Sequence, residues 1–256
     1  MLKRISDPKA EELVQKREFI ALYVPMHLEF VSDLNELDLR QDRQIALFRF
    51  LFNYLLGESL ISEVSEMVRE ENDEMQRIRL ELELSRKIDW MWFGESEKRK
   101  KASTFSELSE KLRGLYYHFD LVTGDLDAIS PVFRRQIVSS LIAVKTVIAH
   151  TLGFGEEPTW IICVDEAEFL NETLQKCINS VFRTDSNRIA LKVATLHYYH
   201  ITLETTDPNT LVSAGNDFNY RIIRSYLISR PECGKKVLTI CAVYLKNHCH
   251  NEKFAL

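Results

Sequence analysis

Two adjacent carboxylates, Asp165 and Glu166, follow a short apolar run, and this arrangement carries the clearest chemistry in the chain. The run, residues 160–164, is too short for a helix and is typical of a strand buried in a parallel sheet. Ligands of open α/β sheets bind just beyond the carboxyl ends of such strands. Carboxylates are ligands for Mg²⁺ and are able to polarise an attacking water. The pair therefore predicts a site at a strand end. The structural alternative is that Asp and Glu simply favour the start of a following helix.

The elements expected to position this pair alternate between strands and helices. Strand patterns cover 19–24, 160–164 and 189–195, with a further short strand-like segment at 200–203. Helix patterns cover 8–17, which begins at Asp7-Pro8, and 168–182. This alternation predicts an α/β fold with a mainly parallel sheet.

A long helical insertion is predicted between the first two strands, over residues 41–150 of one domain that spans 1–256. Residues 78–84 alternate apolar and charged side chains like a strand, but strong helix formers there favour a helix. Ser103 or Thr104 with Glu107 resembles a capping box, and Pro131 is expected to start another helix. The apolar run 90–93 is expected to be buried, and a partner surface is the alternative.

The four apolar residues followed by Asp-Glu resemble the Walker B motif of P-loop ATPases. Over residues 160–223, about a quarter of the chain, the sequence resembles the origin-recognition-complex-like AAA+ ATPases of archaea and bacteria. The matching segments are 162–170, 190–196 and 215–223. The resemblance implies a three-layer fold like that of P-loop NTPases. It also implies that Asp165 helps to hold Mg²⁺ and that Glu166 polarises the attacking water.

The same resemblance implies two further site residues. Thr195 stands at the sensor 1 position, which contacts the γ-phosphate or the attacking water of bound ATP; the alternative is a β-branched residue that suits a strand end. The family also uses an arginine that acts on the nucleotide of a neighbouring subunit. Arg183 and Arg188 lie in the corresponding region, and a solvated surface arginine is the alternative for either.

The phosphate cradle of these ATPases, G-x-x-x-x-G-K-S/T, matches no segment of the chain. The resemblance therefore implies a chain that lacks the first strand and the P-loop, through a truncated gene model, a split gene or degeneration. Without a central strand, its neighbours would expose their edges or pair them anew. The tail 241–256 resembles no segment of the family.

The leading functional hypothesis is an AAA+ protein, or a fragment of one, that binds and hydrolyses ATP with Mg²⁺ in its full-length form to drive conformational change. This chain alone is expected to be inactive because it lacks the cradle. The alternatives are a non-enzymatic scaffold or regulatory protein of the same fold, and a replication initiator that binds DNA by family analogy alone. The expected partners are further copies of the chain or a missing N-terminal segment.

Composition limits the compartment and the class of partner. The 256 residues carry a formal net charge of −5. The chain therefore has no excess of basic residues that would support nucleic-acid binding. Five scattered cysteines indicate a reducing compartment. The N-terminus has no apolar signal core, and the apolar stretch 137–154 is short for a membrane span. A cytoplasmic protein without a membrane partner is predicted.

Overall fold

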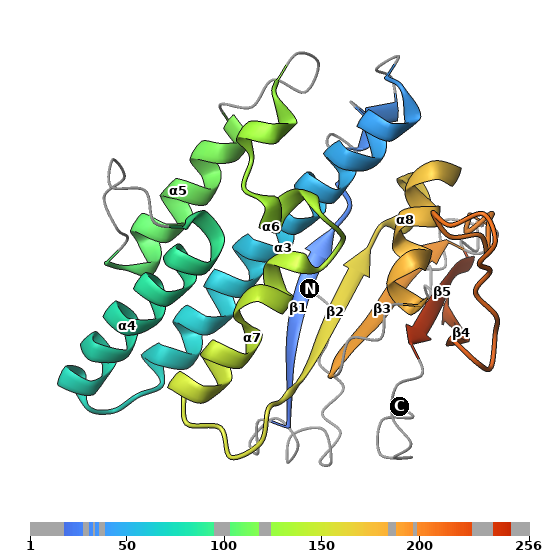
Figure 1. Ribbon diagram of the computed structural model, residues 1–256. Helices are drawn as coiled ribbons and strands as arrows, with labels where there is room; N and C mark the ends of the chain where they lie inside the picture. Colours follow the sequence, from blue (N-terminus) through green and yellow to red (C-terminus); the bar gives the residue numbers. More distant parts are fainter. Residues whose placement is uncertain are drawn as a thin grey trace, which may run out of the picture.

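Five strands in the described part of the chain form one sheet, in the order β1-β2-β3-β5-β4 (Figure 1). A computed structural model gives this architecture and describes residues 18–27, 31–32, 34–35, 39–94, 103–117, 124–183, 188–196, 199–226 and 238–246. Within 220–226 and 238–246 the backbone alone is described. The predicted helix 8–17 lies outside the described residues.

The parallel half of the sheet confirms the predicted α/β class. It consists of β1 (Phe19–Pro25), β2 (Thr159–Asp165) and β3 (Ile189–Leu196). Both neighbouring pairs are parallel, and their register aligns Tyr23 with Cys163 and Val164 with Val193. The carboxyl ends of β1 and β2 therefore meet at Pro25 and Asp165.

An antiparallel hairpin that the sequence patterns did not predict completes the sheet. It consists of β4 (Phe218–Tyr226) and β5 (Leu238–Lys246), and β5 also pairs antiparallel with β3. The second edge of β3 is thus paired within the chain. This is one of the two outcomes expected of a sheet without its central P-loop strand, in which a neighbouring edge finds another partner.

The described residues between β1 and β2 form helices and irregular segments, without a strand. The α-helices are α3 (Gln41–Arg69), α4 (Glu74–Phe93), α5 (Phe105–Tyr117), α6 (Pro131–Arg134) and α7 (Ser139–Thr151). Helix α4 includes 78–84, so the helix formers there prevail over the alternating pattern. Thr104 Oγ1 accepts the Glu107 N–H and Glu107 Oε2 accepts the Ser103 N–H, which confirms the capping box.

Two features of these helices depend on the backbone at a single residue. Helix α3 continues through Gly57, where the absence of a side chain admits close packing: an added Cβ would lie 2.9 Å from Leu112 Cδ2 and 3.3 Å from Trp92 Cη2. The helix predicted from Pro131 breaks into α6 and α7, because Val138 adopts a left-handed backbone with φ 67° just before α7.

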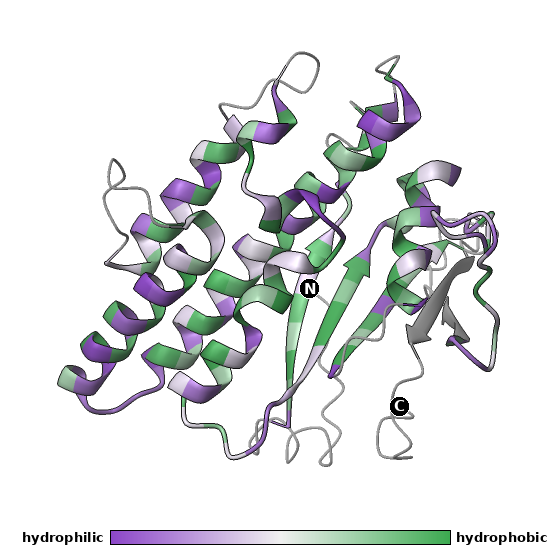
Figure 2. Cartoon of the chain, viewed as in Figure 1, coloured by the Kyte–Doolittle hydropathy of each residue, from purple (hydrophilic) through white to green (hydrophobic). Residues whose placement is uncertain are grey.

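One face of the parallel strands packs on the helices and forms the core. Ile20, Leu22 and Val24 of β1 are buried and belong to one hydrophobic cluster with residues of the helices, whereas Ala21 and Tyr23 are exposed. Figure 2 shows the hydrophobic residues along β1, β2 and β3 and the hydrophilic ones on the outer helix surfaces. The prediction that 19–24 is a buried strand is therefore right for one face only, since the described helices do not cover the other.

Helix α3 is the one helix in the described part of the chain that is long and apolar enough to cross a membrane. It contacts β1, α5, α6, α7 and α8 (Glu172–Arg183), and 61% of its most apolar window is buried inside the protein. The central helix of a globular core has the same length and composition, so α3 is weak support for a membrane span.

Two buried amides of α8 hold the segment that follows β3. Gln175 Nε2 donates to the carbonyl oxygen of Tyr199, and its Oε1 accepts the Ile201 N–H. Asn179 Nδ2 donates to the carbonyl oxygens of Thr202 and Glu204. The segment 200–203, predicted as a short strand, is irregular because these side chains take the backbone groups that a neighbouring strand would use.

The partly buried side chain of His200, next to Asn179, predicts that the stability of the protein depends on pH. Burial lowers the pKa of His200 from 6.5 to about 4, and its Nε2 lies 3.0 Å from Asn179 Oδ1. The unfolded chain binds the proton more readily, so stability is lost as the pH falls from about 6.5 towards 4. We expect the free energy of unfolding to be about 2 kcal/mol lower at pH 5 than at pH 7. Urea unfolding at both pH values measures this difference, and His200→Asn should remove that part of it.

Candidate functional site

Asp165 ends β2 with both carboxylate oxygens engaged by the protein. Its Oδ1 accepts the Glu166 N–H at 2.9 Å, and its Oδ2 accepts the Tyr23 hydroxyl at 3.0 Å. The carbonyl oxygen of Asp165 accepts the Met26 N–H at 3.0 Å, which extends the contact between the ends of β1 and β2. The carboxylate therefore has a fixed orientation at the carboxyl edge of the sheet.

Glu166 has a left-handed backbone, with φ 60° and ψ 32°. This region is unfavourable for a residue with a side chain, and such residues concentrate at functional sites. The turn ends β2 abruptly, and the short 3₁₀ helix Ala167–Phe169 follows. The Glu166 carboxylate is half-exposed, and its Oε2 lies 3.7 Å from His27 Nδ1. A carboxylate with this exposure is open to water at the sheet edge.

Tyr23 is the site residue that sequence reasoning missed. Its ring is 54% exposed, yet desolvation of the hydroxyl, together with the hydrogen bond to Asp165, raises the pKa of Tyr23 to about 12. The hydroxyl is therefore a stable donor to the carboxylate near neutral pH. A signal existed in the sequence: Tyr23 alternates with the apolar residues Leu22 and Val24, which places it on the opposite face of the strand.

Thr195 lies on the strand next to Asp165 but on the other face of the sheet. Val164 pairs with Val193, so the two strand ends are neighbours. Because side chains alternate, Thr195 shares the helix-covered face with Val193, whereas Asp165 shares the face of Tyr23. Thr195 is 3% exposed, in keeping with that position. The structure brings the strand ends together without joining the two side chains, and a sensor role for Thr195 stays a prediction.

The two candidate arginines lie near the amino-terminal ends of the strands, whereas Asp165 lies at a carboxyl-terminal end. Helix α8 returns from the end of β2 to the start of β3, so Arg183 at its C-terminus and Arg188 just before β3 lie near the strand starts. Arg183 pairs with Asp217 Oδ2 at 3.1 Å and donates to the carbonyl oxygen of Leu211. Neither arginine is positioned to reach Asp165 of its own chain, so a finger role would concern a neighbouring copy.

The residues at the end of β2 fit a magnesium ion only in company with a phosphate. Among the residues that the structure describes, no group of three or more His, Cys, Asp or Glu side chains gathers to hold a metal. Magnesium in nucleotide sites takes one or two carboxylates, and water and phosphate oxygens fill its other positions. Asp165 fits the carboxylate share, because each carboxylate oxygen has a second lone pair beyond the one used in its hydrogen bond.

Comparison with protein families decides the relationship of the chain. The model of the ORC-CDC6-like family matches residues 1–254. The chain belongs to the ORC-CDC6-like family. A search of curated proteins gives no match, and neither does a search of solved structures. Membership confirms the resemblance read from 160–223 and places the chain among proteins related to AAA+ ATPases.

The extent of this match corrects one expectation. The tail 241–256 was expected to resemble no family segment, but the ORC-CDC6-like match continues to residue 254. The segments that resemble the family, 162–170, 190–196 and 215–223, all end before residue 224. Strand β5 and the residues after it contain none of these short segments, so only a comparison over the whole chain includes them.

Proposed function

We propose that this ORC-CDC6-like protein supplies the hydrolytic carboxylates of an AAA+ ATPase. The observation that carries the proposal is the end of β2, where Asp165 is held by Tyr23 and Glu166 adopts a left-handed turn. Asp165 would hold Mg²⁺ and Glu166 would accept a proton from the attacking water. Bound Mg²⁺ supplies the positive charge that neutralises the phosphates.

The phosphate-binding half of such a site is absent from the 256-residue sequence as a recognisable motif. We therefore propose that a further segment or a partner supplies it, and we call the resulting complex the complete assembly. Thr195 and Arg183 are proposed to contribute as the family resemblance implies, Arg183 towards a neighbouring copy. A cytoplasmic location is part of the same proposal.

Nucleotide binding by the chain alone is the first test. A fluorescent ATP analogue with Mg²⁺ is titrated against the wild type and Asp165→Asn, with Asp207→Asn, an exposed aspartate on the loop after β3, as the matched control. We expect no saturable binding by any of the three chains, because no motif holds the phosphates. The complete assembly, purified through a tag on this chain, is expected to bind and to lose at least about ten-fold in affinity in Asp165→Asn.

Two results would change the proposal. Saturable binding by the chain alone that is lost in Asp165→Asn would show a cradle without the usual motif and would refute the need for a partner. Absence of binding by the assembly as well would favour the second candidate, a scaffold that keeps the fold without nucleotide. The observation that favours this candidate is that no segment of the 256-residue sequence matches the phosphate cradle.

A further inference from the structure

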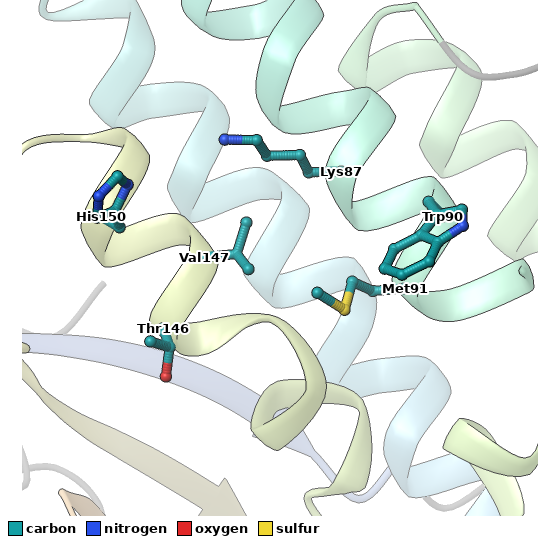
Figure 3. A pocket seen from close by; sticks show the side chains of 6 residues that line it. All are labelled: Lys87, Trp90, Met91, Thr146, Val147 and His150. Carbon is teal, nitrogen blue, oxygen red and sulfur yellow. The ribbon is translucent and has the colours of Figure 1, made fainter.

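A groove lies between α4 and α7, on the side of the helical insertion (Figure 3). Its volume is about 420 Å³, within the range of ligand sites. Met91 of α4 and Val147 of α7 point towards each other in the groove, and the indole of Trp90 stands beside Met91. Trp90 is 51% exposed although its neighbour Trp92 is fully buried. Exposed Trp and Met side chains are typical of the centre of protein interfaces.

Among the described residues, the rim of this groove carries more basic than acidic side chains. Lys87 reaches across from α4 and donates to Thr151 Oγ1 of α7, and His150 stands on the α7 side. Arg86 is exposed on the same stripe of α4 as Trp90, four residues away. Among the residues that the structure describes, the acid at this rim is Glu83, which forms an ion pair with Lys87 at 2.5 Å, and this hydrogen bond chiefly lowers the pKa of Glu83. An occupant that combines apolar side chains with negative charge would suit this groove.

The chain carries a surface of that chemistry at the turn between α3 and α4, which we call the acidic tip, residues 70–78. Its charged residues are Glu70, Glu71, Asp73, Glu74 and Arg77. Two large apolar side chains, Met75 and Ile78, are 75% and 53% exposed there. They are three residues apart on α4 and therefore neighbours on one stripe of the helix. The tip thus presents an apolar pair beside four carboxylates, one of which, Glu74, pairs with Arg77 at 3.8 Å; the exposed Arg79 follows on α4.

We propose that the acidic tip of one copy docks into the α4–α7 groove of a second copy. Met75 and Ile78 pack against Trp90 and Met91, and the carboxylates of the tip face Lys87, Arg86 and His150. The tip does not reach its own groove, because Met75 and Trp90 stand about 22 Å apart along the single helix α4.

The contact joins two different surfaces, so it is heterologous. Each added copy leaves one tip and one groove available, and the assembly closes into a ring or grows as a filament. The contact lies on the helical insertion and involves neither Asp165 nor nucleotide. It therefore stands independently of the proposed ATPase function.

Sedimentation velocity of the full chain over a range of concentrations tests this contact. The wild type is expected to associate reversibly, and added salt is expected to weaken the association because charges border the contact. Trp90→Ala in the groove and the double variant Met75→Ala/Ile78→Ala in the tip are each expected to weaken association at least about ten-fold. Tyr117→Ala on α5, which removes an exposed aromatic ring outside both surfaces, should leave the association unchanged.

Mixing the two defective proteins provides the decisive measurement. The groove variant keeps an intact tip and the tip variant keeps an intact groove, so an equimolar mixture is expected to form a 1:1 dimer that grows no further. Circular dichroism of each variant verifies its fold. A wild type that stays monomeric up to its solubility limit would overturn the proposal. So would association that survives either variant, or a mixture that does not combine.

Discussion

Replacing Glu166 with glutamine is expected to slow ATP hydrolysis by the complete assembly about 10²–10⁴-fold, the usual contribution of a general base. Glutamine keeps the size of the side chain but is unable to accept a proton from water. Because Asp165 and its bond to Tyr23 are untouched, nucleotide binding should persist. Phosphate release at saturating ATP measures the rate, and the fluorescent ATP analogue measures binding on the same sample.

Glu168→Gln is the matched control for this change. Glu168 is a partly exposed carboxylate two residues further along, in the 3₁₀ helix after the turn. Its replacement is expected to leave hydrolysis within about two-fold of the wild type, since mutations that touch no reacting group alter the barrier little. Equal rates for the Glu166 variant and the wild type would remove Glu166 from the mechanism and leave its strained turn as a structural feature.

Replacing Trp92 with alanine is expected to lower the free energy of unfolding by about 3–5 kcal/mol, as for other large aromatic residues in cores. Trp92 is 0% exposed, and its Nε1 donates to the carbonyl oxygen of Ser140 at 3.0 Å. Its ring packs edge-on to Phe133 with centroids 5.6 Å apart, and it lies over Gly57. The change therefore opens a cavity where α3, α4 and α7 meet. Urea unfolding followed by circular dichroism measures the loss.

Trp90→Ala offers a control of identical chemistry two residues away. Trp90 is half-exposed, and its replacement is expected to cost about 1 kcal/mol or less. If Trp92→Ala is too unstable to purify, Trp92→Phe keeps most of the ring volume and removes the hydrogen bond to Ser140, with an expected loss of about 1–3 kcal/mol. Equal stabilities for the Trp90 and Trp92 alanine variants would contradict the packing described for α4.

The sequence was sufficient for the elements whose patterns are local. The apolar run before Asp165 predicted β2 and placed Asp165 at the carboxyl end of that strand, and the capping residues near Glu107 predicted the start of α5. The same local argument separated helix from strand over 78–84. In each of these cases the residues that decide the structure are within one or two turns of each other, so neighbouring sequence contains the necessary information.

Features that depend on distant parts of the chain were not predictable in this way. Tyr23 reaches Asp165 only because β1 and β2 pair in one particular register, across the whole helical insertion. The run 90–93 has one composition but two environments, since Trp92 faces the core and Trp90 faces the groove. Strand β5 lies beside β3 because the second edge of β3 is available for pairing. No local sequence pattern indicates which edge is available.

The pairing of β1 with β2 determines the order in which parts of the sheet are able to fold during synthesis. Phe19 pairs with Thr159, so 140 residues separate the partners. At about 5–20 residues per second, β1 emerges from the ribosome roughly 7–28 s before its partner. The insertion is complete earlier, since α7 ends at Thr151, and α3 already covers one face of β1 and accepts the Tyr23 N–H at Ser59 Oγ. The helices therefore cover one face of β1 before β2 is synthesised. Slower translation of residues 152–165 would lengthen the period in which the unpaired edge of β1 is available for pairing with another nascent chain.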